Sequence, residues 1–94
     1  MQMFVDSVVS QLHADRNEFH RRVEVTRLDS EGYVRFAHVG DTSHCVELCV
    51  PRPSDHRVCY SRPGGWSVRS GPYVTADEAV AIAAAYVREL IDAP

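Results

Sequence analysis

The residues that could do chemistry are concentrated between positions 43 and 61, in the stretch SHCVELCVPRPSDHRVCYS. This stretch holds every cysteine of the chain and two of its five histidines, namely Cys45, Cys49, Cys59, His44 and His56. Cysteine thiolates and histidine rings are common zinc ligands, a cysteine beside a base can be a nucleophile, and two neighbouring cysteines can form a disulfide. Which of these chemistries is open to the chain depends on the elements that hold the side chains.

Five strand-like runs separated by turn signals occupy the middle of the chain. They are Val23–Leu28, Tyr33–Val39, His44–Val50, Arg57–Ser61 and Trp66–Ser70. The intervening segments DSEG, GDT, PRPSD and RPGG are rich in residues that turns favour. In RPGG, Pro63 and Gly64 suit the two central positions of a type II turn. Short connections of this kind predict an antiparallel meander.

One helix is predicted on each side of the strands. From Gln2 to about His20, an apolar face recurs at helical spacing, with Val5, Val8, Val9, Leu12 and Phe19. A second helix begins with a capping box formed by Thr75 and Glu78. Its apolar stripe contains Ala79, Ile82, Ala83, Tyr86 and Leu90. The order α–β–β–β–β–β–α predicts one two-layer α+β domain over residues 1–94, with both helices on one face of a four- to five-stranded antiparallel sheet.

Side chains alternate between the two faces of a strand, so residue parity predicts which face the helices cover. The apolar residues of four strands are even-numbered: Val34, Phe36, Val46, Leu48, Val50, Val58, Tyr60, Trp66 and Val68. A three-residue loop, Gly40–Thr42, sets Phe36 opposite Val46 on the helix-covered face. On the other face the same loop sets Arg35 opposite Glu47, which is a favourable cross-strand charge pair.

The two outer strands extend this register. A last hairpin that pairs Tyr60 with Trp66 makes Trp66, like Phe36, a core residue. In the first strand Val23 and Val25 are odd-numbered and break the even pattern. Their pairing stays open between a β-bulge and a different loop length.

The predicted register argues against a zinc site. Cys45 and Cys49 lie four residues apart on one strand, which separates them by roughly 13 Å. Two thiolates on one zinc lie within about 4.6 Å of each other, so we predict no metal and no cofactor. Cys49 and Cys59 are expected close together on neighbouring strands, where a disulfide is geometrically open. In a reducing compartment we expect free thiols that act as small packing residues.

No catalytic constellation accompanies the cysteines. The five histidines are scattered, and the chain has no Gly-x-Ser-x-Gly motif, P-loop or dinucleotide fingerprint. The parity of His56 places it on the helix-covered side or in a loop, away from the thiols. We therefore predict that the protein is not an enzyme.

Composition restricts the setting and the partners. The net charge is −3, and all ten basic residues are arginine. A negative chain is poorly suited to non-specific nucleic-acid binding, which relies on neutralising phosphates. No run approaches the roughly 20 apolar residues of a membrane span, and the N-terminal stretch lacks the early basic residue of a signal peptide. With an odd number of cysteines, these features predict a cytoplasmic protein that does not enter a membrane.

The sheet face away from the helices is the candidate binding surface. Its proposed site residues are Tyr33, Arg35, Glu47, Cys49, Arg57, Cys59 and Arg69. Arginine and tyrosine are enriched at protein interfaces, and thiols are poorly suited to bulk water. We predict a protein–protein interaction module whose partner is another protein or, in a homodimer, a second copy of the chain.

Nucleic-acid binding is the alternative. A helix-flanked antiparallel sheet loosely resembles RNA-recognition and double-stranded-RNA-binding folds. Arginines on the sheet, or Arg16 and Arg21 at the basic end of the first helix, could contact phosphates. RNA-recognition sheets, however, stack bases on several aromatic residues, and this face offers Tyr33 alone.

The last third of the chain, GGWSVRSGPYVTADEAVAIAAAYVREL, in a chain without lysine, resembles short accessory proteins of GC-rich actinobacteria and their phages. This resemblance implies a small protein that acts by binding something in the host cell. The order of elements is also similar to the frataxin-like fold, whose first helix and first-strand edge are acidic and serve iron. Here Asp6, Asp15 and Glu18 are interleaved with basic residues, so iron binding is not carried over.

Overall fold

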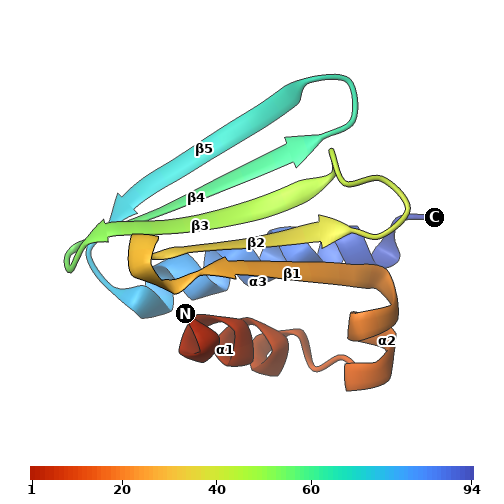
Figure 1. Ribbon diagram of the computed structural model, residues 1–94, viewed down its shortest axis with the longest axis horizontal. Coiled ribbons are helices and arrows are strands. Elements are labelled where there is room, and N and C mark those ends of the chain that lie inside the picture. Colours follow the sequence, from red (N-terminus) through yellow and green to blue (C-terminus); the bar gives the residue numbers. More distant parts are fainter.

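The structure, a computed structural model of residues 1–94, has a five-stranded sheet between N-terminal and C-terminal helices (Figure 1). In chain order the elements are α1 (Gln2–Leu12), α2 (Arg16–Arg22), β1 (Val23–Leu28), the short 3-10 helix η1 (Asp29–Glu31), β2 (Tyr33–His38), β3 (Cys45–Arg52), β4 (Asp55–Arg62), β5 (Trp66–Tyr73) and α3 (Ala76–Asp92). The strands are ordered β1-β2-β3-β4-β5, and every neighbouring pair is antiparallel. The predicted α+β meander is confirmed.

The helices form one layer against the sheet. Helix α3 contacts β2, β3, β4 and β5, α1 packs against α3, and α2 contacts β1. One cluster of 18 buried hydrophobic residues joins the two layers. It includes Val8 from α1, Phe19 from α2, Leu90 from α3 and Phe36 from β2. Fully burying a side chain of this size contributes about 1.5–3 kcal/mol, so this shared core holds the helices on one face and leaves the other face open.

The N-terminal helical region differs from the prediction of a single helix. Helix α1 ends at Leu12, where His13 adopts a left-handed conformation with φ 52°. Helix α2 then begins after Asp15, whose carboxylate accepts hydrogen bonds from the backbone N–H groups of Asn17 at 2.7 Å and Glu18 at 3.4 Å. An aspartate in this position caps a new helix, and the break turns Phe19 into the core. No helix of the chain has both the length and the apolar character needed to cross a membrane.

The parity rule is confirmed in the centre of the sheet. Phe36 lies opposite Val46 and Arg35 lies opposite Glu47, as predicted. In the first strand Val25 lies opposite Phe36, so odd residues of β1 share the face of even residues of β2. No bulge separates the two strands. A connection through η1 and Gly32 supplies the change of parity, so the loop length resolves the question that the sequence left open.

The last hairpin is shifted by two residues from the predicted register. Tyr60 lies opposite Val68, and Arg62 lies opposite Trp66. The core position predicted for Trp66 is therefore wrong, because its side chain lies at the strand end and is 47% exposed. The ring packs edge-on against Tyr60 at 6.0 Å between centroids, and the Arg62 guanidinium lies 4.8 Å from its centroid.

Candidate functional site

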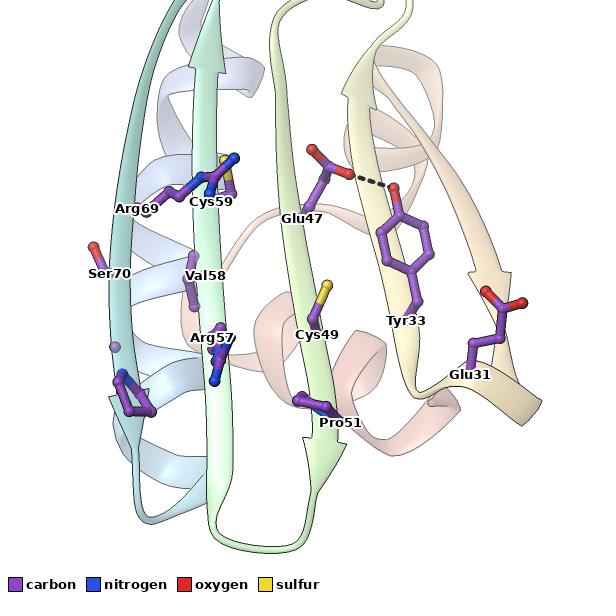
Figure 2. Close-up of a pocket in the computed structure, with 12 residues that line it drawn as sticks. Glu31, Tyr33, Glu47, Cys49, Pro51, Arg57, Val58, Cys59, Arg69 and Ser70 are labelled. Atoms are coloured by element: carbon purple, nitrogen blue, oxygen red, sulfur yellow. Dashed lines mark hydrogen bonds between the residues drawn. The ribbon is translucent and has the colours of Figure 1, made fainter.

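The open face of the sheet contains a hollow of about 790 Å³ that spans β2 to β5. We call this hollow the groove, and Figure 2 shows the side chains that line it. Six of the seven predicted site residues line it: Tyr33, Glu47, Cys49, Arg57, Cys59 and Arg69. The seventh, Arg35, lies outside. Its guanidinium donates to the backbone carbonyl of Thr42 at 2.5 Å, which draws the side chain toward the β2–β3 loop.

The strand registers explain why the face is hollow. Arg69, Cys59 and Glu47 are cross-strand partners in one row over β5, β4 and β3. In the next row Arg57 on β4 lies opposite Cys49 on β3, and Cys49 lies opposite Tyr33 on β2. Short cysteine side chains thus stand between longer side chains on both sides (Figure 2). The two thiols form the floor of the groove, and the longer residues form its walls.

One wall of the groove is made by Tyr33 and Glu47. The Tyr33 hydroxyl donates to Glu47 Oε2 at 2.6 Å, and Figure 2 marks this bond. Burial raises the pKa of Tyr33 above its usual range, and the hydrogen bond to Glu47 adds to the shift. The predicted charge pair between Arg35 and Glu47 has the expected register, but no ion pair forms between them. Tyr33, the diagonal neighbour, takes the carboxylate instead.

The opposite wall carries Arg57 and Arg69. Arg57 makes a two-point ion pair with Asp55, through Nε to Oδ1 at 2.7 Å and a terminal nitrogen to Oδ2 at 2.9 Å. The Arg57 partner lowers the pKa of the Asp55 carboxyl. Arg69 is exposed and has no side-chain hydrogen bond or ion pair. The groove therefore has one cation that is available to a ligand.

Cys49 and Cys59 are diagonal neighbours rather than directly opposite each other. Cys49 pairs with Arg57, and Cys59 pairs with Glu47. All three cysteines are free thiols, and Cys45 is buried. Burial raises the pKa of the Cys49 thiol, and the charge of Glu47 raises it further. A protonated thiol is a poor nucleophile, so Cys49 lacks the activation that covalent chemistry needs.

The predicted site did not include several groove residues, which come from η1, from the interior of β4 and from the second halves of β3 and β5. They are Glu31, Pro51, Val58, Ser70, Gly71 and Pro72. Part of this edge is shaped by a register shift between β4 and β5, which lies between His56 and Val58. Gly71 has φ 105°, and a Cβ there would lie 2.7 Å from the His56 carbonyl oxygen. The sequence signal that could have marked this edge is a proline or glycine inside a strand, which is typical of bulges and strand ends.

Comparisons with protein-family models, with curated proteins and with solved structures find no match. No group of three or more His, Cys, Asp or Glu side chains is arranged to hold a metal ion. The chemistry that the groove itself offers is recognition: a tyrosine, carboxylates and guanidinium groups arranged around a floor of thiols.

Proposed function

We propose that the protein is a non-enzymatic interaction module that binds a partner protein through the groove. The observation that supports this is the composition of the lining, which combines both signs of charge with an aromatic ring, two prolines and two thiols in one hollow. Interfaces between proteins favour tyrosine and arginine and combine an apolar centre with a polar rim. The volume of about 790 Å³ is also within the range of ligand sites in proteins.

The charges in the groove favour a protein over a nucleic acid. Glu31 and Glu47 both line it, and carboxylates repel phosphates. Arg57 is already paired with Asp55, which leaves Arg69 as the one unpaired cation. Sheets that read RNA use several stacked aromatic residues, whereas this groove has Tyr33 alone, with its hydroxyl held by Glu47.

The composition suggests a setting for this activity. We propose an accessory protein of a GC-rich bacterium or its phage that acts in the cytoplasm on a host protein. The all-arginine basic complement supports this setting, because arginine codons are GC-rich. An extract of such a bacterium is therefore the natural source of partners for a test.

A photo-cross-linking amino acid at the rim of the groove tests the proposal. Pro51 is exposed and lines the groove, and Ala85 is exposed on α3 in the helix layer and serves as the matched control. In extract, we expect a discrete protein adduct from position 51 and none from position 85. Adducts from both positions, or from neither, would contradict the proposal.

Two further treatments identify the class of partner. An adduct that disappears after nuclease treatment would point to nucleic acid. Variants at Arg16 and Arg21, which lie at the two ends of α2, would then test that helix as the binding surface. An adduct of doubled mass in the purified protein, formed from position 51 alone, would identify a second copy of the chain.

A further inference from the structure

We infer that the groove binds an extended peptide segment that carries an acidic side chain for Arg69 and a basic side chain for Glu47, spaced as acidic-x-x-basic. This inference rests on the proposed function and specifies the chemistry of the partner. The expected occupant of the groove is one segment of another protein, which lies across the strands. Glu31, at the far end of the groove, adds a second carboxylate on the side that takes the basic residue.

The charges on the two walls are arranged for such a ligand. Arg69 has no side-chain partner, and it shares a row with Cys59 and Glu47. Glu47 uses Oε2 for the Tyr33 hydroxyl, while Oε1 has no side-chain partner. Glu31 is exposed and makes no ion pair. The groove thus has a free cation on β5 and free carboxylate oxygens toward β2 and β3, and a ligand of opposite polarity would complement both.

The spacing of the strands that carry Arg69 and Glu47 favours one conformation of the segment. The backbone positions of Arg69 and Glu47 are separated by two strand intervals, which is about 9.6 Å. In an extended polyproline II segment, residues i and i+3 lie on the same side and are about 9.3 Å apart. In a regular β-strand residues i and i+3 point to opposite sides, so that conformation fits less well. An acidic-x-x-basic segment in polyproline II form would therefore carry its two charges at the spacing of the backbone positions of Arg69 and Glu47.

The shape of the face favours a narrow ligand over a second copy of the chain. The floor is made of the short side chains of Cys49 and Cys59, and the rims are made of long ones (Figure 2). Two copies placed face to face would set one hollow against another and leave unfilled space, which is destabilising. A single extended segment fills the hollow and leaves its backbone accessible to water.

The probe is a library of random dodecapeptides displayed on phage, selected on the intact protein. We expect enriched sequences to share one acidic and one basic residue separated by two positions. Arg69→Glu is the test variant because Arg69 is exposed and has no partner whose loss could unfold the chain. Arg21→Glu makes the same change of charge at an exposed position on α2 and is the matched control.

The variants give the decisive readout. The consensus should be unchanged for Arg21→Glu, and on Arg69→Glu the acidic residue should be replaced by a basic one. A selected peptide, synthesised with a fluorophore, should bind Arg69→Glu at least about tenfold more weakly than the parent, because like charges then face each other. A selection that enriches no peptide, a consensus without the charge pair, or a consensus that Arg69→Glu leaves unchanged would overturn the inference.

Failure here can be separated from failure of the proposed function. A protein adduct from position 51, combined with no charge-pair consensus, would leave the interaction module standing and remove this ligand. Absence of both results would remove both proposals. Binding of the selected peptide should also weaken as salt rises, because its charged contacts are exposed to screening.

Discussion

Tyr33 and Glu47 are coupled by the hydrogen bond that joins β2 to β3 along one wall of the groove. The phenol is the donor and the carboxylate the acceptor, so deprotonating Tyr33 would lose the bond and place two negative charges together. Burial is the larger cause of the raised pKa of Tyr33, and Glu47 is the next. The hydroxyl therefore remains a donor throughout the neutral pH range and holds one carboxylate oxygen of Glu47 in place.

This coupling predicts a specific titration. In an ultraviolet absorbance titration, the difference between the parent and Tyr33→Phe isolates the Tyr33 phenol, which should ionise above the usual tyrosine range. Glu47→Gln removes the carboxylate charge and should lower the pKa of Tyr33 only in part, because burial remains. An unchanged Tyr33 titration in Glu47→Gln would show that the two side chains are not coupled in solution.

At the level of elements, the β4–β5 hairpin decides the shape of the groove edge. Its register changes between His56 and Val58, and Gly71, on the facing part of β5, has φ 105°. The backbone there approaches the His56 carbonyl so closely that a Cβ would lie 2.7 Å from its oxygen. Both the left-handed conformation and the lack of space require glycine.

A pair of glycine substitutions separates these two requirements. Gly64 also has a positive φ, of 94°, but no atom lies within 4 Å of the Cβ position. We expect Gly64→Ala to cost about 1 kcal/mol of unfolding free energy from the backbone conformation alone. Gly71→Ala should cost clearly more, because the clash with backbone adds to the strain. Equal losses in urea unfolding would show that the close approach to His56 is absent.

The register of this hairpin gives Trp66 a different role from Phe36, the core aromatic residue of β2. Phe36 is fully buried in β2, whereas Trp66 is 47% exposed at the start of β5. Phe36→Ala should lower the unfolding free energy by about 3–5 kcal/mol, and Trp66→Ala by roughly 1–2 kcal/mol. Chemical unfolding of both variants measures the difference. A larger loss for Trp66→Ala than for Phe36→Ala would favour the register that pairs Tyr60 with Trp66 and would contradict the one described here.

The stability of the whole molecule should depend on pH through His44. Its Nε2 lies 2.7 Å from the Tyr60 hydroxyl, and burial lowers the pKa of His44 below its ordinary value of 6.5, with the charge of His38 as the next cause. The unfolded chain then binds the proton more tightly than the folded one, so stability rises with pH. This contribution is complete above pH 6.5 and is lost as the pH falls below it.

Thermal unfolding, measured from about pH 7.5 to about pH 5 in steps of roughly half a pH unit, tests this dependence. The melting temperature of the parent should fall as the pH drops through this range, and His44→Asn should flatten the fall. His13→Asn removes an imidazole from an exposed site whose left-handed φ of 52° asparagine tolerates, and it should keep the slope of the parent. If His13→Asn and His44→Asn flatten the curve equally, His44 is not the responsible group.

The sequence by itself determined the layers of this protein. Alternation along each strand is a local property, so the even parity of Phe36, Leu48 and Val58 was enough to predict the buried face. That parity in turn assigned Tyr33 and the thiols to the open face. The capping box at Thr75 likewise marked the start of α3, where the Thr75 hydroxyl accepts from the Glu78 N–H at 3.4 Å.

Only the tertiary structure decided how the strands are aligned beside one another and which charges are free. A shift of two residues preserves parity, so the sequence could not distinguish Tyr60 opposite Trp66 from Tyr60 opposite Val68. The observed register places Trp66 at the strand end instead of in the core. The partner of Glu47 was equally undetermined, because Arg35 lies directly opposite it and Tyr33 diagonally opposite it on the neighbouring strand. Backbone closure at the turns and the bulge set these distances, and they leave Arg69 unpaired above a floor of cysteines.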